Sequence, residues 1–320
     1  MEFSTIPNLY ISFSSRMKEL VIKAVIFLGI NFSLALVAVN VPQYLYSWNN
    51  ANTDSNLKII PENQKFDLLI MGTSRARGLS RGKSHAFLER VLRKRVINIA
   101  RGGGGGIVPE SLYFEWFVTR GNSADVIIYA IDPFVFFSDL WNRKRFFATD
   151  EPLDFGFLCL MVKKHISTTV VWNYILSKFT VDWLLDRPQN FEKKQKKLNR
   201  NDPEAVHKRI QSLYLEGVKE VTFRRYSKAF ETLVQQMSRH ANRVVLLFIP
   251  TLLGHEPGQD KVAELCRKLT EKYRNVEFYD MASAMQFPLF FYNHDHMNNQ
   301  GVSQFVLKYL KPILSQNERA

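Results

Sequence analysis

The chain has 320 residues, 46% of them hydrophobic, which excludes a wholly disordered protein and allows one N-terminal anchor plus a single body of about 250 residues. Its formal net charge of +13 suits an anionic lipid surface or an acidic polymer, or is simply solubilising surface charge. Zinc-ligand spacing, an aromatic ribonucleoprotein signature and a basic zipper are all missing from the sequence, so we expect no nucleic-acid partner.

A segment near the N-terminus predicts a membrane anchor. Residues 24–53 carry no charge, and the most apolar part, 20–41, has about the length of a bilayer's hydrocarbon core. Tyr44, Tyr46 and Trp48 follow it as an interfacial aromatic belt would. A cleaved signal peptide is the alternative, but the apolar stretch is long for one and no clear cleavage site follows. We therefore expect a cytoplasmic N-terminus at 1–19, an anchor at 20–48 in the cytoplasmic membrane, a linker at 49–65, and a body that faces the periplasm or the cell exterior.

The body alternates apolar runs with helical stretches, which predicts an α/β fold. Five runs are typical of buried parallel strands, at 66–71, 96–99, 125–131, 244–249 and 276–279. Helices are expected at 81–94, 108–119, 261–273 and 302–314. Strands spaced by helices favour a three-layer α/β/α arrangement, with a five-stranded parallel sheet in flavodoxin-like order.

The connection between the third and fourth predicted strands is too long for one crossover. We interpret 138–242 as an inserted helical cap, which leaves 66–137 and 243–320 as the catalytic domain. The apolar part of the cap could lie on a membrane or a partner, and its basic part, 187–209, could meet lipid head groups or a polyanion. A solvated charged face is an equal alternative. A second membrane span at 155–176 is disfavoured, because three basic residues interrupt it.

The end of the first predicted strand carries a candidate nucleophile. Ser74 follows Gly72 and Thr73 where the buried strand ends, before a turn into a helix. Ligands of parallel sheets bind at that edge, and a helix N-terminus offers N–H groups to a developing oxyanion. The alternative is that Ser74 serves only as a helix N-cap.

A loop before the last predicted helix carries a candidate base. His296 could accept the serine proton if the loop folds back to the sheet edge, provided that an acid or amide binds its other nitrogen. With His294 and Asp295 it could also suggest a metal site, which we disfavour because no third cluster supplies further ligands. Cys159 and Cys266 show no metal spacing. We expect both to be buried thiols, and a disulfide between them stays open.

Together these segments resemble the SGNH hydrolase superfamily over about 66–314, apart from the cap. Residues 72–74 resemble its Gly-Asp-Ser block, 98–106 its glycine-containing second block, and 295–301 its last block. With the anchor, the motifs are similar to a membrane-anchored bacterial branch, which includes the proteins of teichoic-acid D-alanylation and alginate O-acetylation. The resemblance implies a nucleophile at Ser74, a base at His296, and oxyanion donors at Ser74, Gly103, Gly104 and the position of Asp132.

Two positions depart from the family pattern. The family has an aspartate three residues before the histidine, where this chain has Asn293. Asp295 directly precedes His296, and adjacent side chains rarely point the same way. An asparagine can still fix the imidazole tautomer, but it stabilises imidazolium less. Asp132 replaces an asparagine oxyanion donor, and a carboxylate donates only when protonated. Both departures leave slow acyl transfer or a binding role open.

Three arginines near these motifs are candidate substrate-binding residues. Arg75 and Arg77 lie beside the nucleophile and Arg101 beside the glycine run, where they could hold a carboxylate or phosphate. The alternative is surface charge or structural ion pairs. A nucleotide phosphate loop at the glycines 102–106 is rejected, because no Lys-Ser/Thr follows them and the downstream acidic residue of the dinucleotide pattern is missing.

The leading hypothesis is a membrane-anchored serine O-acyltransferase or esterase that acts on a cell-envelope polysaccharide, without cofactor or metal, alongside a polytopic membrane-bound O-acyltransferase. The alternative is a non-catalytic accessory protein that binds polymer and docks on that partner. A lipid-directed esterase is a third possibility. A separation of about 3–4 Å between the side chains of Ser74 and His296 would favour catalysis, and one beyond about 8 Å the accessory role.

Overall fold

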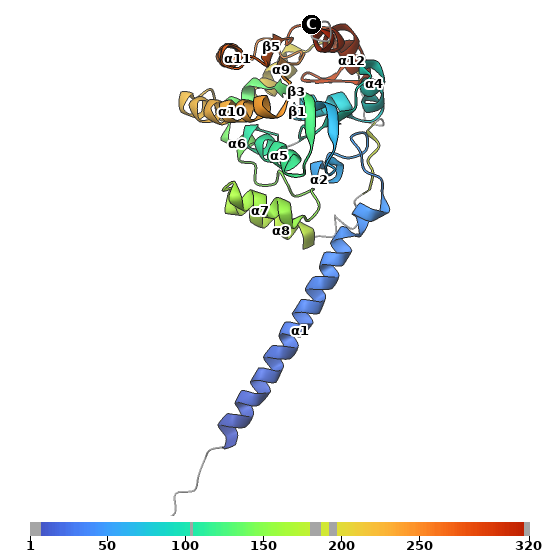
Figure 1. Ribbon diagram of the computed structural model, residues 1–320. Helices are drawn as coiled ribbons and strands as arrows, with labels where there is room; N and C mark the ends of the chain where they lie inside the picture. The colour runs from blue at the N-terminus through green and yellow to red at the C-terminus, as the bar shows by residue number, and fades with distance from the viewer. Residues whose placement is uncertain (1–7, 103–104, 180–186, 192–196, 317–320) are drawn as a thin grey trace, which may run out of the picture.

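The computed structural model of the protein describes residues 8–102, 105–179, 187–191 and 197–316. A long N-terminal helix, α1 (Asn8–Leu45), projects from one end of a body built on a single large sheet (Figure 1). The predicted anchor at 20–48 falls mostly on α1. Within the described ranges, no helix is both long enough and apolar enough to cross a membrane.

The body contains a five-stranded sheet whose strand order is β2-β1-β3-β4-β5. All four strand pairs are parallel. The strands are β1 (Lys65–Gly72), β2 (Val96–Asn98), β3 (Ser123–Ile131), β4 (Arg243–Phe248) and β5 (Val276–Asp280). The predicted α/β class and the five predicted strands are confirmed. The apolar runs of the first four strands are largely buried, as expected for a covered parallel sheet, whereas the edge strand β5 is buried only at Val276.

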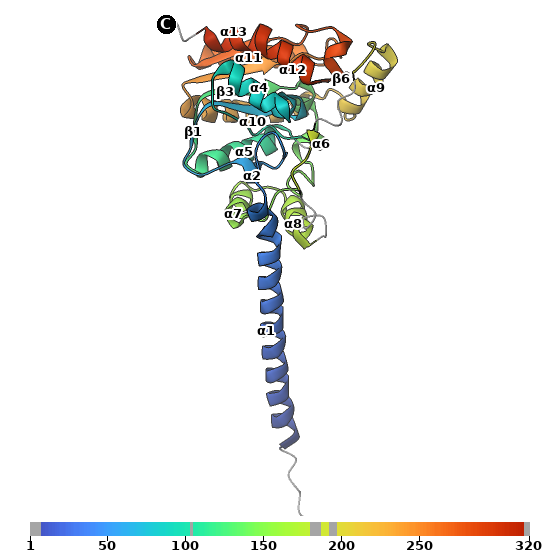
Figure 2. The same cartoon turned by 90° about the vertical axis from the view of Figure 1, so that its right-hand side faces the viewer.

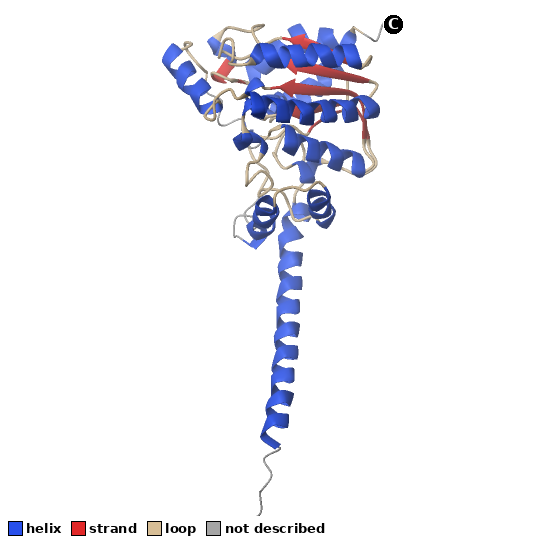
Figure 3. Ribbon diagram, turned by 90° about the vertical axis from the view of Figure 1, so that its left-hand side faces the viewer, coloured by secondary structure: helices blue, strands red, loops and turns tan. Residues whose placement is uncertain are grey.

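Helices cover both faces of the sheet, as Figures 2 and 3 show. Alternate residues of β1 belong to separate cores, with Leu69 and Met71 on one face and Leu68 and Ile70 on the other. The first core also holds side chains of α5 (Ile107–Thr119), α10 (Glu220–His240) and α11 (Gln259–Lys272). The second holds side chains of α4 (Lys83–Leu92), α12 (Asn299–Phe305), a π-helical turn (Val306–Leu310) and α13 (Lys311–Ser315).

Short elements complete the body. The helices among them are α2 (Asn56–Ile59), α3 (Ser74–Arg77), η1 (Gly78–Ser80), η2 (Pro133–Phe137), α6 (Asp139–Asn142), α7 (Phe155–Lys163), α8 (Thr168–Leu176), η3 (Ser177–Phe179), α9 (Pro203–Leu213) and η6 (Pro288–Phe290). A separate antiparallel hairpin pairs β6 (Phe291–Asn293) with β7 (His296–Met297).

The long connection between β3 and β4 ends in a helix that packs on the sheet. Its last helix, α10, packs on β3 and β4 and buries Phe230, Leu233 and Val234 in the core of the sheet. The predicted cap range of 138–242 therefore includes a helix that belongs to a layer of the sheet.

Cys159 in α7 is exposed, so the expectation that it is buried was wrong, whereas Cys266 in α11 is buried as expected. Both cysteines are free thiols.

Candidate active site

The carboxyl end of β1 brings Ser74 next to His296, although 222 positions separate them in the chain. Ser74 opens α3 immediately after the strand, and its Oγ lies 2.8 Å from Nε2 of His296. Ser74 is half-buried and His296 is only 9% exposed. This separation lies within the range for direct proton transfer from a hydroxyl to an imidazole.

The β6–β7 hairpin positions the imidazole. Asn293 pairs with His296 across the hairpin, so His294 and Asp295 form the turn between the strands. The Oδ1 atom of Asn293 accepts a hydrogen bond of 3.1 Å from the backbone N–H of Asp295, which tightens the turn. The ring of Tyr292 stacks on that of His296, with 5.4 Å between the centroids. The imidazole of His296 is therefore held by its own turn and by an aromatic neighbour.

The far nitrogen of His296 faces two acceptors. Its Nδ1 lies 3.0 Å from Oδ1 of Asn293 and 3.1 Å from Oδ1 of Asp295. Both oxygens can only accept, so the proton of a neutral ring belongs on Nδ1. Nε2 then has a lone pair directed at the hydroxyl of Ser74. The tight turn lets the adjacent Asp295 and His296 side chains meet, which sequence reasoning did not expect.

Asp295 is held in its ionised form. Burial alone would raise its pKa, but the hydrogen bond and charge of His296 and the nearby Arg75 keep it well below the usual range. Arg209 of α9 also binds its other carboxylate oxygen through Nε at 3.0 Å and Nη2 at 2.7 Å. The carboxylate can therefore stabilise the imidazolium that forms when His296 takes a proton.

Arg75 lies at the centre of the carboxylates around Ser74. Its Nη1 lies 2.8 Å from Asp132 and 2.7 Å from Glu256, and its Nε lies 3.7 Å from Asp295. Burial alone would lower the pKa of Arg75, but the three carboxylates raise it. The structure thus brings this predicted substrate-binding residue to the site as an ion-pair partner of the site's own acids.

Asp132 makes acceptor contacts rather than donor contacts. Its Oδ2 accepts a hydrogen bond from the hydroxyl of Thr73, and its Oδ1 pairs with Arg75. Burial raises the pKa of Asp132, while the charge of Arg75 and the bond from Thr73 oppose that rise. In this arrangement Asp132 fixes the residues on either side of Ser74 in the chain.

Sequence reasoning missed three residues of this cluster, Glu256, Tyr214 and Arg209. Glu256 follows β4, and its Oε2 accepts a hydrogen bond of 3.4 Å from the hydroxyl of Tyr214. Arg209 ends the basic stretch that we assigned to lipid, polymer or solvent. Composition showed that this stretch was basic, but only the fold shows that one of its members faces Asp295.

The glycines at this edge let backbones approach closely. Gly103 and Gly104, the predicted oxyanion donors, lie outside the described residues. A Cβ on Gly105 would lie 2.6 Å from the carbonyl oxygen of Arg101 and 3.1 Å from Cα of Thr73, so the end of the run abuts the residue before the nucleophile. Gly72 has a backbone φ of +128°, a conformation that residues with a side chain rarely adopt. A Cβ at this position would also clash with the carbonyl of Ala130.

Glu110 of α5 ties two strand ends together. Its carboxylate accepts hydrogen bonds from the backbone N–H of Gly72 at 3.1 Å and of Arg101 at 3.0 Å. Burial raises the pKa of Glu110 to about 8, although both N–H donors and the charge of Arg101 oppose the rise. This residue, which sequence reasoning also missed, fixes the turn that presents Ser74 relative to the start of the glycine run.

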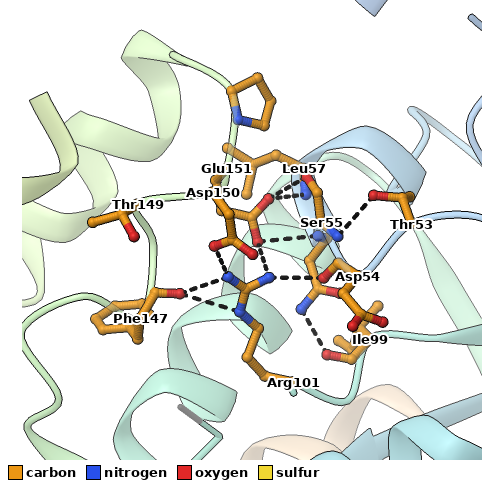
Figure 4. Close-up of polar contacts among 12 residues, drawn as sticks. Thr53, Asp54, Ser55, Leu57, Ile99, Arg101, Phe147, Thr149, Asp150 and Glu151 are labelled. Carbon is orange, nitrogen blue, oxygen red and sulfur yellow. Dashed lines mark hydrogen bonds and ion pairs between the residues drawn. The ribbon is translucent and has the colours of Figure 1, made fainter. Parts of the chain in front are cut away.

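Arg77 and Arg101 bind the chain that enters the body. Arg77 donates to Asp54 at 2.9 Å and to the carbonyl of Asn50 at 3.0 Å. Arg101 donates to the carbonyls of Asp54 at 2.7 Å and Phe147 at 2.8 Å, as Figure 4 shows. Their guanidinium groups serve structural ion pairs and backbone carbonyls, which was the alternative to substrate binding.

Glu151 completes this attachment. Its carboxylate lies 3.0 Å from Nη1 of Arg101 and accepts from the hydroxyl of Ser55 and the backbone N–H groups of Asn56 and Leu57 (Figure 4). The segment predicted as a linker, 49–65, is thus packed onto the body.

Within the described ranges, no group of three or more histidine, cysteine or acidic side chains is arranged to hold a metal ion.

No protein-family model and no curated protein matches this chain. Two similar solved structures are mutants of Axe2 from Geobacillus stearothermophilus, described as an acetylxylan esterase and as an acetyl-xylooligosaccharide esterase. The first is 14% identical with a TM-score of 0.39, and the second 15% identical with a TM-score of 0.38. Each match covers 79% of this chain and 95% of the other. At these scores the likeness carries no argument about function.

Proposed function

We propose that the protein is a serine esterase or O-acyltransferase of the SGNH type. The observation that carries this proposal is the 2.8 Å contact between Oγ of Ser74 and Nε2 of His296, with an ionised Asp295 on the other side of the ring. This separation is close to the about 3–4 Å expected of a catalytic pair and far below the about 8 Å expected of a non-catalytic accessory protein. It favours catalysis over the accessory role.

In the first half of the proposed reaction, Oγ of Ser74 attacks an acyl carbonyl carbon while its proton passes to Nε2 of His296. The tetrahedral intermediate then collapses, and the bond to the leaving alkoxide breaks. His296 returns the proton to that alkoxide, which leaves an acyl ester on Ser74. Asp295 stabilises the transient imidazolium, and the amide oxygen of Asn293 shares the proton on Nδ1.

In the second half, His296 removes a proton from an acceptor hydroxyl, whose oxygen attacks the carbonyl carbon of the acyl ester. The bond from that carbon to Oγ then breaks, and His296 returns the proton to Oγ, which regenerates Ser74. Water as acceptor gives an esterase, and a sugar hydroxyl gives an O-acyltransferase. We propose that backbone N–H groups of Ser74 and of one glycine in the run 102–106 hold the oxyanion. Gly105 lies against Thr73, and this contact brings the end of the run close to the nucleophile.

The motif resemblance extends the proposal to a substrate class, a location and a partner. We propose a cell-envelope polysaccharide as acceptor or substrate, a polytopic membrane-bound O-acyltransferase as partner, and an anchor at 20–48 with the body outside the cytoplasm. The described part of α1 supports the anchor, because its large apolar side chains Val25, Phe27, Leu28 and Ile30 are exposed. Alkaline extraction of cell membranes tests it, since an anchored chain stays in the pellet.

Covalent labelling of the full chain with a fluorophosphonate probe tests the catalytic proposal. We expect one adduct, on Ser74, and none in Ser74→Ala. Ser80→Ala is the matched control, because Oγ of Ser80 lies 3.4 Å from Nδ1 of His85 in a second, partly buried serine–histidine contact. It should label like the unaltered chain. Folded protein that does not react at Ser74 would move the function to the accessory role.

The identity of the acceptor is tested separately. The acyl-enzyme formed from an activated acyl ester is mixed with oligosaccharide in water, and the acyl group is followed by mass spectrometry. Transfer to the sugar supports the acyltransferase, and release as free acid alone supports the esterase.

A further inference from the structure

Helices α7 and α8 expose a row of large apolar side chains on their outer faces. On α7 the row contains Phe155, Cys159 and Val162, and on α8 with the following turn η3 it contains Trp172, Leu176 and Phe179. Both rows follow the i, i+4, i+7 spacing of a single helix face. Trp172 is 61% exposed and Val162 is 60% exposed.

The inner faces of the same helices are apolar as well. Phe157 is buried and stacks on Tyr113 at 5.5 Å between ring centroids, and Trp116 meets it edge-on at 5.6 Å. Val170 and Tyr174 are buried on α8. A helix on the surface of a soluble body needs one apolar face, so packing against the body does not account for the outer rows. Exposed apolar rows of this extent mark a surface that meets another apolar phase.

The position of these helices suggests which phase that is. Figures 1 and 2 place α7 and α8 at the end of the body from which α1 leaves, beside its C-terminal end. Exposed apolar side chains of α1 and those of α7 and α8 are thus found at the same end of the body. The end of α7 and the turn after it carry Lys163, Lys164 and His165, all exposed. Lys164 pairs with Glu115 of α5, and the charge of Lys163 suits the anionic head groups of a bilayer.

We propose that the outer faces of α7 and α8 lie in the interfacial layer of a lipid bilayer and rest the body on the membrane. The apolar rows would enter the boundary between head groups and acyl chains, with Lys163 at the level of the phosphates. Trp172 would take the interfacial position that tryptophans favour. This inference rests on the proposed anchor, because α1 sets the end of the body that meets the membrane.

Cys159 gives a direct probe, because it lies within the outer row of α7 and is exposed. Burial raises the pKa of the other thiol, Cys266, so a maleimide should react at Cys159 alone. The full chain labelled there with an environment-sensitive fluorophore is reconstituted into phosphatidylcholine–phosphatidylglycerol vesicles. We expect emission shifted to shorter wavelength than in detergent-free buffer, and quenching by lipids brominated on the upper acyl chain.

A matched control moves the label to the far side of the body. The double variant Cys159→Ser, Glu271→Cys places it on α11, where Glu271 is exposed. Bromolipids should not quench that label. In a second variant, Trp172→Glu with Leu176→Glu, quenching at Cys159 should fall markedly while the chain still floats with the vesicles. Val221→Glu, at an exposed apolar position on α10, should leave quenching unchanged.

Each outcome decides one question. A chain that does not float with vesicles contradicts the proposed anchor and this inference together. A chain that floats while the Cys159 label stays in water contradicts only the inference. A label that is shielded from water but not quenched by bromolipid overturns it in favour of a protein surface, either a second copy of this chain or a partner.

Discussion

Arg75 and Arg77 lie two residues apart in α3, and both are buried, yet they serve different regions. Arg75 joins the acids around Ser74, namely Asp132, Glu256 and Asp295. Arg77 binds Asp54 and the carbonyl of Asn50 in the segment that leads into the body. Neighbours at this spacing point in nearly opposite directions from a helix axis, so one short helix can hold a catalytic loop on one side and an incoming chain on the other.

The two regions also differ in what surrounds the cation. Three carboxylates raise the pKa of Arg75 despite burial, whereas burial and the charges of Arg81 and Arg101 lower the pKa of Arg77 to about 10 against the opposing charge of Asp54. Around Arg75, several charged side chains gather near Ser74 and His296. Around Arg77, one cation binds the backbone carbonyls of the segment that enters the body. Proximity of an arginine to a nucleophile in sequence therefore does not identify a substrate-binding residue.

The largest expected effect belongs to the catalytic region. His296→Gln removes the base, so kcat/KM toward an activated acyl ester should fall by about three to six orders of magnitude. The thermal unfolding midpoint should change little, because Gln retains much of the volume. Steady-state kinetics and a melting curve on the same preparation check both statements. A loss below tenfold would remove His296 from the mechanism.

Arg77→Met should show the opposite pattern. It removes the buried partner of Asp54, while Arg81 still pairs with that partly exposed carboxylate, so we expect a loss at the low end of the about 3–5 kcal/mol that breaking a buried pair costs. We expect a large drop in the unfolding midpoint, with kcat per folded molecule nearly unchanged. Arg120→Met is the matched control, because Arg120 pairs with Glu62 at the surface, where such pairs contribute about 0–1 kcal/mol. Equal destabilisation by both variants would contradict the structural role of Arg77.

The two acceptors on His296 should not be equivalent. Asp295→Asn removes the charge that stabilises imidazolium and should lower kcat by about two to four orders of magnitude. Asn293→Ala leaves that charge in place and should cost less. Because the pKa of Asp295 lies well below the usual range, the pH profile should show no titration of Asp295 above about pH 4. A larger loss in Asn293→Ala would make the amide the principal orienting group.

The last prediction concerns Glu110, which bonds to Gly72 in one region and to Arg101 in the other. Folding raises its pKa to about 8 from an ordinary value of about 4.3, so the folded state holds a proton that the unfolded state lacks between these values. Stability contributed by this group is therefore present at low pH and is lost as pH rises toward 8, with a slope of up to about 1.4 kcal/mol per pH unit.

Glu110→Gln cannot titrate and should lose that slope. Melting curves from about pH 5 to pH 9 would check it, with Glu115→Gln as the control on the same helix. A slope that persists in Glu110→Gln would assign the titration to another group. The Gln variant should also be less stable at low pH, because its amide can accept from only one of the two backbone N–H groups.

Much of the fold could be predicted from local sequence. Apolar runs mark the strands of a covered sheet, and each of the five runs became a strand, including the half-exposed edge strand β5 with its Glu277. The positions of Ser74 after β1 and of His296 before α12 are also properties of the sequence, because the ends of elements are marked by glycines, polar turns and changes of hydrophobic period. These signals depend on only a few neighbouring residues, so they can be interpreted from the sequence without the tertiary structure.

Tertiary structure alone decided where the charged side chains went. The contact of Asp295 with His296 depends on a two-residue hairpin turn, and that of Arg209 with Asp295 on a helix 86 positions earlier in the chain. Whether Arg75, Arg77 and Arg101 would meet substrate, acids or backbone carbonyls had no local signal. A long cation is drawn to whichever acceptor the fold brings within reach, and burial strengthens that choice because an unpaired charge inside a protein is costly.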